Sequence, residues 1–117
     1  MNILSGLFGS PVPTLSASDL QEKLQNGRQP YVLDVRQPEE FRSGHIIAAK
    51  LIPLGELSGR IKDLPTDREI VCVCQSGSCS VSATRKLIAA GYNAINMEGG
   101  MIAWQRARLP IKKGATP

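Results

Sequence analysis

The sequence predicts a single α/β domain built around a parallel β-sheet. Short apolar runs alternate along the chain with segments whose apolar residues recur at helical spacing, as in folds where helices connect parallel strands. Residues 70–73 form an apolar run with no polar alternation, which is typical of a central parallel strand covered on both faces. The length of 117 residues suits one compact domain and is too short for two.

The domain is expected to span residues 14–110, with a tail at each end. Residues 1–13 form the expected amino-terminal tail and linker, because the glycine and prolines near its end resist regular structure. The first eight residues are apolar but have no basic residues before them, so they make a poor signal peptide. A loosely packed tail is the favoured interpretation, and a short contact with a membrane surface is the alternative. Residues 111–117 form the expected basic carboxyl-terminal tail.

Three strands and two helices are expected in the first half of the domain. Leu15 begins a short strand, and Ser16 offers an N-cap to the helix that follows. Residues 31–35 are apolar and rich in β-formers, which suits a buried strand. Proline and two acids at 38–40 are typical of a first helical turn. Residues 49–52 form the third strand, which a proline ends.

The second half continues the alternation of helices and strands. Residues 54–64 carry leucine and isoleucine at helical spacing and precede the central strand. Residues 80–90 predict a helix that a glycine ends. Residues 93–97 form the last strand and residues 101–108 the last helix. Right-handed crossovers between such strands place helices on the faces of a parallel sheet.

The composition limits the classes of partner. A formal net charge of +4 and a pI near 9.2 favour small anionic substrates or acidic partners through long-range steering. The basic residues are scattered and have no run of aromatics beside them, so no nucleic-acid binding is expected. No stretch approaches the roughly 20 apolar residues of a membrane span. The three cysteines do not resemble a secreted disulfide framework, so we expect a cytoplasmic protein, with its oligomeric state left open.

Cys74 directly follows the expected central strand, at the edge of the sheet where reactive groups gather in open α/β folds. The loop after it consists of small residues around a central glycine, Gly77. Such a loop can turn its backbone N–H groups inward, and the next helix adds the positive end of its dipole. Both effects favour a thiolate on Cys74, or the terminal sulfur of a persulfide anion.

Simpler interpretations of the cysteines also exist. Cys74 could be a small apolar residue at a strand end, and the residues alone leave both interpretations open. Cys72 lies within the strand and is expected to be an inert core residue. Metal binding by Cys72, Cys74 and Cys79 is disfavoured, because their spacing lacks a clear fourth ligand. No dinucleotide fingerprint is present, and neither a cofactor nor a metal is expected.

A set of short motifs occurs in an order that resembles rhodanese-like domains. The resemblance runs from about Thr14 to Pro110. Each motif alone is weak, but their joint order is specific. The motifs are Asp34-Val35-Arg36, Glu40-Phe41, Gly44-His45-Ile46, Ile52-Pro53-Leu54, Cys74 with Ser76-Gly77, Gly91-Tyr92, Gly99-Gly100, Trp104 and Pro110.

The resemblance implies a parallel five-stranded sheet and a nucleophilic Cys74. It also implies a sulfurtransferase, which would carry sulfane sulfur on Cys74 as a persulfide and pass it to a thiophilic acceptor such as a thiol. Asp34 and Arg36 could line the site, although a hydrogen bond to each other or to the backbone is the favoured interpretation. His45 could act as a general base, but is expected to be a hydrogen-bonding scaffold residue. The expected substrate-binding residues are Gln75, Ser76, Gly77, Ser78, Cys79, Ser80, Asp34 and Arg36.

One departure from the family pattern concerns Cys79, which stands where rhodanese loops commonly have an arginine. A guanidinium can hold the sulfonate end of thiosulfate by paired hydrogen bonds, whereas a cysteine cannot. Thiosulfate is therefore in doubt as the donor, and a persulfide on another protein or on a small molecule is an equal candidate. Arg36 or Arg42 could partly replace the missing arginine.

Two alternatives to sulfur transfer also use a cysteine loop. A phosphatase is disfavoured, because its cysteine loop is one residue longer and ends in an arginine that neither Cys79 nor Ser80 provides. A redox or persulfide-sensing module would use Cys74 with Cys79, which can form a disulfide if their Cα atoms approach to about 4.4–6.8 Å. The side chain of Cys79 is expected to turn away from the loop, so sulfur transfer is the preferred function.

Overall fold

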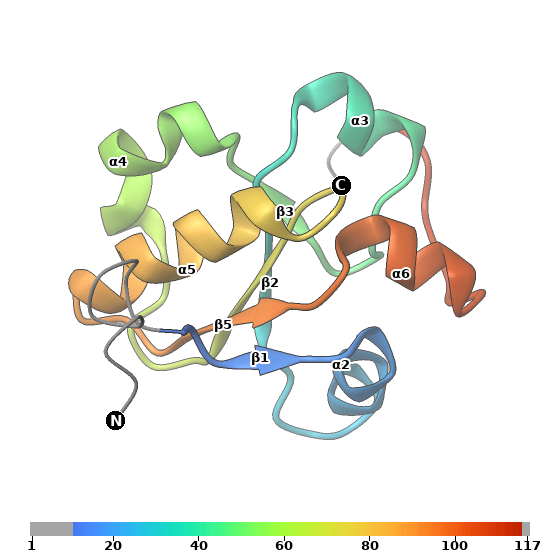
Figure 1. Ribbon diagram of the computed structural model, residues 1–117, viewed down its shortest axis with the longest axis horizontal. Helices are drawn as coiled ribbons and strands as arrows, with labels where there is room; N and C mark the ends of the chain where they lie inside the picture. Colours follow the sequence, from blue (N-terminus) through green and yellow to red (C-terminus); the bar gives the residue numbers. More distant parts are fainter. Residues whose placement is uncertain (1–10, 116–117) are drawn as a thin grey trace.

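The computed structural model describes residues 11–115, which fold around one parallel sheet of five strands (Figure 1). The strand order is β1-β5-β4-β2-β3, so β4 is central and lies between β5 and β2. The register pairs Cys72 of β4 with Leu33 of β2 and with Asn96 of β5. The strands are β1 (Thr14–Leu15), β2 (Tyr31–Asp34), β3 (Lys50–Leu51), β4 (Ile70–Val73) and β5 (Ala94–Met97).

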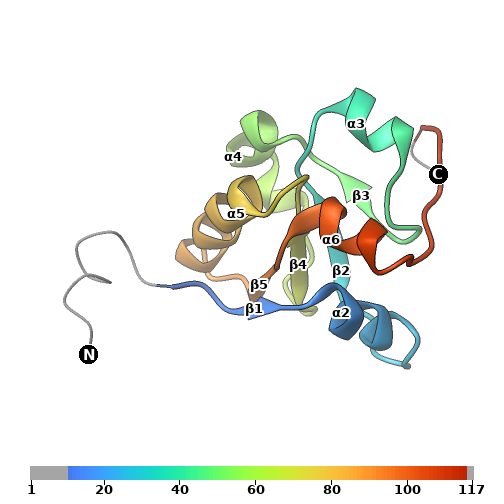
Figure 2. The same ribbon diagram turned by 45° about the vertical axis from the view of Figure 1, so that its right-hand side comes forward.

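Helices cover both faces of this sheet. Figure 2 shows α4 and α5 on one side of the strands and α2 and α6 on the other. The fold class predicted from the sequence is thereby confirmed. The helical segments are α2 (Ala17–Leu24), α3 (Pro38–Ser43), η1 (Leu54–Glu56), α4 (Leu57–Arg60), η2 (Ile61–Asp63), α5 (Ser78–Ala89) and α6 (Gly100–Arg106).

Each face of the sheet has its own apolar core. Successive side chains of a strand point to opposite faces, so β4 contributes to both cores. Val71 and Val73 pack in the cluster that contains Trp104 of α6. Cys72 packs in the opposite cluster, which contains Leu87 of α5. All four residues of β4 are buried, as its uninterrupted apolar run predicts.

Local capping explains where the first helices begin. The side chain of Ser16 accepts a hydrogen bond from the backbone N–H of Asp19 at 3.0 Å. Ser16 is therefore the N-cap of α2, as the sequence predicts. Pro38 lies in the first turn of α3, where backbone N–H groups make no intrahelical hydrogen bonds, so the N–H that proline lacks is not needed. The backbone N–H of Gln37 donates to the carboxylate of Glu40 at 3.2 Å and stabilises the same turn.

Several segments differ from their predicted extents. The helix expected over residues 54–64 is divided into η1, α4 and η2, and Gly55 and Gly59 lower its helical propensity. The third strand contains only Lys50 and Leu51. The helices expected over residues 80–90 and 101–108 begin earlier, because Gly77 and Gly99 act as N-caps with positive φ.

The chain after α6 returns to the domain and pairs with it. The indole N–H of Trp104 donates to the carbonyl of Pro110 at 2.8 Å. His45 and Lys112 then form an antiparallel bridge, with each backbone N–H donating to the other carbonyl at 3.0 and 2.8 Å. The N–H of Gly114 donates to the carbonyl of Arg42 at 2.8 Å. The described part of the expected carboxyl-terminal tail is therefore hydrogen-bonded to the domain.

No helix within residues 11–115 is both long enough and apolar enough to cross a membrane. The expectation for the first ten residues, a loosely packed tail or a membrane-surface contact, lies outside the described residues. The last two residues of the expected basic tail lie outside them as well.

Candidate active site

Cys74 lies immediately after β4, at the carboxyl end of the central strand. Two strands flank this position, because β4 pairs in parallel with both β2 and β5. The loop from Cys74 to Gly77 then leads directly into α5 (Figure 1). This is the edge of the sheet at which parallel α/β folds bind their ligands, as the sequence predicts.

The loop directs a backbone donor at the sulfur of Cys74. Gly77 adopts a left-handed conformation with φ of +111°, which favours glycine, and its N–H donates to Cys74 Sγ at 3.0 Å. The Cys74 residue is 3% exposed, so little water competes for this hydrogen bond. Ser78 begins α5 directly after Gly77, which brings the positive end of the helix dipole to the same loop. Both features stabilise negative charge on sulfur.

A second contact to the sulfur comes from a buried polar pair. The hydroxyl oxygen of Ser80 lies 3.3 Å from Cys74 Sγ, and the Ser80 hydroxyl also reaches the side-chain oxygen of Asn96 on β5. Both residues are buried: Ser80 has no exposed surface, and Asn96 is 4% exposed. The Ser80 hydroxyl donates its hydrogen to Asn96 and accepts from the thiol of Cys74. A thiolate or persulfide anion at Cys74 could only accept, so Ser80 would then have to turn its hydrogen from Asn96 to sulfur.

The start of α6 holds the Cys74 loop in place from the other side. The N–H groups of Met101 and Ile102 donate to the carbonyls of Cys74 and Gln75 at 2.8 and 3.1 Å. This approach depends on Gly100, which has φ of +59°. A Cβ atom at Gly100 would overlap the Cys74 carbonyl and would lie 2.5 Å from the Gln75 carbonyl oxygen. The loop and α6 therefore form one packed unit.

The other two cysteines have different surroundings from Cys74. Cys72 is fully buried, as predicted for a core residue, and burial raises the pKa of its thiol to about 11. Cys79 is exposed in the first turn of α5. All three cysteines are free, so the structure contains no Cys74–Cys79 disulfide.

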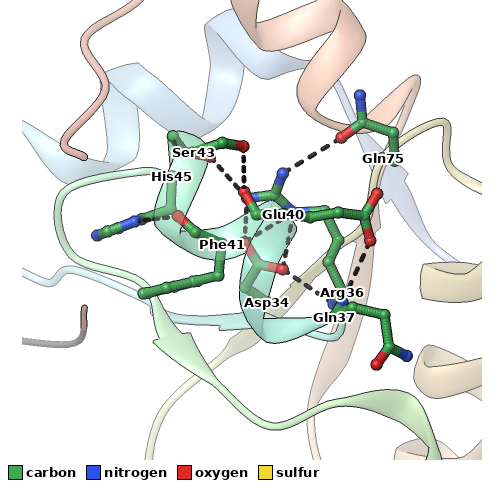
Figure 3. Close-up of polar contacts among 9 residues, drawn as sticks. Asp34, Arg36, Gln37, Glu40, Phe41, Ser43, His45 and Gln75 are labelled. Carbon is green, nitrogen blue, oxygen red and sulfur yellow. Dashed lines mark hydrogen bonds and ion pairs between the residues drawn. The ribbon is translucent and has the colours of Figure 1, made fainter. Parts of the chain in front are cut away.

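Asp34 and Arg36 bind each other, as the favoured interpretation of the sequence holds (Figure 3). The Arg36 Nε and Nη2 atoms donate to the two carboxylate oxygens of Asp34 at 3.0 and 2.9 Å. Nη2 also donates to the carbonyl of Gly44 at 2.7 Å. Arg36 reaches the Cys74 loop through one bond, from Nη1 to the side-chain oxygen of Gln75 at 3.2 Å. Most hydrogen bonds of this buried guanidinium therefore go to Asp34 and Gly44, and one joins it to the loop.

The other predicted substrate-binding residues lie in the loop and in the first turn of α5. Gln75, Ser76, Ser78 and Cys79 are exposed, whereas Ser80 is buried beneath them. Arg42, the second candidate replacement for the missing loop arginine, is exposed on α3.

His45 lies apart from the sulfur site. Its ring stacks on Phe41 with centroids 3.7 Å apart, and its Nδ1 lies 2.8 Å from the Phe41 carbonyl. A carbonyl only accepts hydrogen bonds, so Nδ1 carries the hydrogen. Figure 3 shows His45 and Gln75 on opposite sides of the Asp34–Arg36 pair. These contacts match the scaffold role expected for His45 and give no support to a general base.

Two parts of the site were not identified from the sequence. Asn96 interrupts the apolar run of β5, and this buried polar position was a signal that could have indicated it. The donors from Met101 and Ile102 had no sequence signal beyond the Gly99-Gly100 motif. Within residues 11–115, no group of three or more His, Cys, Asp or Glu side chains is placed to hold a metal ion.

The fold and the cysteine loop define a parallel α/β domain with a thiol at the end of its central strand. The family model of the rhodanese-like domain matches residues 16–107, so the chain belongs to this family.

Individual relatives resemble the chain over most of its length. A protein of Allochromatium vinosum named sulfurtransferase is 34% identical, with 86% of this chain and 94% of that protein covered. Thiosulfate sulfurtransferase 18 of Arabidopsis thaliana is 36% identical, with coverage of 94% and 90%. A rhodanese-related protein of Thermoplasma volcanium has a crystal structure that matches with a TM-score of 0.80 and 32% identity, covering 86% of this chain and 97% of that one.

Proposed function

We propose that this protein is a sulfurtransferase that carries sulfane sulfur as a persulfide on Cys74. The observation that carries the proposal is the hydrogen bond from the Gly77 N–H to Cys74 Sγ at the end of β4. The donor favours the thiolate that attacks sulfur, and the same loop can stabilise the persulfide that results. The names of the relatives from Allochromatium vinosum and Arabidopsis thaliana support the same class of reaction.

The reaction has two displacement steps. In the first, the Cys74 thiolate attacks the sulfane sulfur of the donor and forms a sulfur–sulfur bond. The bond between that sulfur and the rest of the donor breaks, and its electron pair leaves with the donor as a thiolate or sulfite. In the second, an acceptor thiolate attacks the outer sulfur, and the electron pair of the broken bond returns to Cys74 Sγ. Neither step needs an oxidant or a reductant.

A persulfide is the better candidate for the donor than thiosulfate. Cys79 supplies no positive charge to the loop, and the guanidinium of Arg36 is already bound to Asp34 and Gly44. The loop therefore offers a sulfonate group only uncharged donors, namely backbone N–H groups, hydroxyls and the Gln75 side-chain amide. We propose that organic persulfides load Cys74 faster than thiosulfate does, and that a thiol is the acceptor. The three free cysteines suit a reducing compartment, and we propose the cytoplasm.

The redox alternative lacks a specific structural observation in its favour. Cys79 is exposed, Cys74 is buried, and both are free. Sulfur transfer remains the function that the geometry supports best.

Intact-mass measurement tests the proposal directly. The protein would be incubated with thiosulfate and, separately, with glutathione persulfide, and the modified residue would be located by peptide mapping without reductant. The expected result is a gain of one sulfur atom on Cys74, faster with the persulfide. The absence of this adduct with both donors would exclude the mechanism.

A further inference from the structure

A groove of about 580 Å³ runs beside the Cys74 loop, along the exposed side of α6. Its wall combines the loop, the turn before α6, and α6 with its C-cap. Among the described residues that line it, one carries a charge. The lining residues are Ser76, Gly99, Ile102, Ala103, Arg106 and Ala107.

The groove has a fixed position relative to the sulfur. Ser76, which lines it, is two residues from Cys74, and Ile102 donates its backbone N–H to the carbonyl of the intervening Gln75. The neighbouring bond from Met101 to the Cys74 carbonyl locks the same two segments together. A molecule bound along α6 would therefore lie next to the loop that holds the reactive sulfur.

Arg106 is the polar feature of this groove. It lies in the last turn of α6 and is exposed. Within the part of the chain that the structure describes, its guanidinium has no hydrogen bond or ion pair. A guanidinium can bind a carboxylate through two parallel hydrogen bonds, and none of these donors is used by a protein group here. The adjacent Ile102 is 38% exposed and offers an apolar surface to a carbon chain.

We propose that this groove binds the organic part of an anionic persulfide donor, with Arg106 holding a carboxylate. The inference rests on the sulfurtransferase function proposed above and specifies its donor as a small peptide-like persulfide. Charge complementarity with Arg106 and apolar contact with Ile102 select such a molecule. In thiosulfate the sulfonate is bonded directly to the sulfane sulfur. Arg106 lies five residues along α6 from Met101, about 7.5 Å at 1.5 Å per residue, so thiosulfate is too short to reach Cys74 and Arg106 together.

Binding in the groove requires no new chemical step. The Cys74 thiolate takes the outer sulfur of the donor, the donor sulfur–sulfur bond breaks, and its electron pair leaves as the donor thiolate. Arg106 does not touch the reacting sulfur atoms, so it acts on donor affinity and specificity. Its effect is expected in the donor concentration that gives half of the maximal loading rate, with the limiting rate unchanged.

The experiment compares two donors of the same carbon skeleton on the full-length wild type and three variants. The donors are glutathione persulfide and its diethyl ester, in which both carboxylates are masked. The proteins are the wild type, Arg106→Gln, Ala107→Glu and Arg108→Gln. Arg108 lies outside the groove lining, two residues from Arg106, so Arg108→Gln is a control that removes the same charge elsewhere. The rate of sulfur gain on Cys74 is measured by mass spectrometry as a function of donor concentration.

We expect Arg106→Gln to raise the half-saturating concentration of glutathione persulfide about fivefold, as for a partly exposed ion pair. Its loading by the diester should equal that of the wild type, and Arg108→Gln should match the wild type with both donors. Ala107→Glu adds a carboxylate to the same wall and keeps Arg106. It should also weaken the binding of glutathione persulfide and leave the binding of the diester unchanged.

The two proposals fail in different ways. If the wild type gains no sulfur from either donor, the sulfurtransferase function itself is wrong. If the wild type is loaded and both groove variants bind glutathione persulfide as well as it does, the groove assignment is wrong and the function stands. An equal loss with the diester would also overturn the assignment, because the effect would not depend on the carboxylate.

Discussion

Cys72 and Cys74 lie two residues apart and belong to the same apolar cluster, yet their chemical surroundings differ. Cys72 is inside β4, where both neighbouring strands satisfy the backbone and burial raises the pKa of its thiol to about 11. Cys74 is just beyond the strand, where the chain turns and the N–H of Gly77 becomes available to its sulfur. We propose that the end of the strand, and not burial alone, decides which thiol can react.

The largest expected effect separates the two cysteines by activity. We expect Cys74→Ser to abolish sulfur transfer, because the hydroxyl cannot replace the thiolate as a carrier of sulfur. Cys72→Ser should keep most of the activity, because its side chain lies inside the core. Transfer of sulfur from a persulfide donor to a thiol acceptor would be measured for both variants. Undiminished transfer by Cys74→Ser would show that another group carries the sulfur.

The next effect concerns the support that α6 gives to the loop. Gly100→Ala would place a Cβ atom against the carbonyls of Cys74 and Gln75 at a φ that disfavours alanine. We expect it to lower the free energy of unfolding by roughly 2–4 kcal/mol and to slow the loading of Cys74. Urea denaturation and the mass-based loading assay would measure the two effects.

Gly59→Ala provides the matched control for this substitution. Gly59 lies in α4, and no atom lies within 4 Å of the position of its added Cβ. Alanine is the better helix former, so Gly59→Ala should leave loading unchanged and stabilise the protein slightly, by about 0.4–1 kcal/mol. Equal behaviour of the two variants would contradict a specific role for Gly100.

The smallest effect is a pH dependence of stability that belongs to Cys72. Burial makes folding favour the neutral thiol, since its pKa rises from an ordinary 9.0 to about 11. Below pH 9 the thiol is protonated in both states and its contribution is complete. As the pH rises further, the unfolded chain loses the proton first, so stability falls until the pH passes the folded-state value.

Denaturation of the wild type and of Cys72→Ala at several pH values between 8 and 11 would isolate this contribution. We expect the wild type to lose roughly 1–3 kcal/mol more than the variant over this range. Parallel pH profiles of the two proteins would mean that Cys72 ionises as easily in the folded state as in the unfolded chain.

The sequence predicted the elements whose signals are local. β4 could be predicted because its apolar run is visible in the local sequence alone. The position of Cys74 followed from the end of that run. The prediction of one helix over residues 54–64 was wrong, because it used only the spacing of apolar residues and ignored Gly55 and Gly59. Apolar spacing reports which side of a segment is buried, and it is less sensitive to breaks in the backbone.

The parts of the site that escaped prediction depend on contacts between distant segments. Asn96 matters because β5 lies beside β4, which brings its side chain to Ser80. Gly100 matters because α6 approaches the Cys74 loop to within hydrogen-bonding distance. Arg36 was assigned correctly to Asp34, but its bond to Gln75 joins residues far apart in the sequence. Such pairings follow from the topology, which local patterns do not specify.

The bridge between His45 and Lys112 affects how the protein can be shortened. The family match ends at residue 107, and a chain cut there would lack the segment that pairs with the backbone of His45. It would also lack the carbonyl of Pro110 that accepts the Trp104 indole hydrogen bond. A boundary taken from sequence similarity would thus leave the backbone of His45 and the indole N–H of Trp104 without these partners. Fusion partners and affinity tags are better attached after the residues that close this side of the domain.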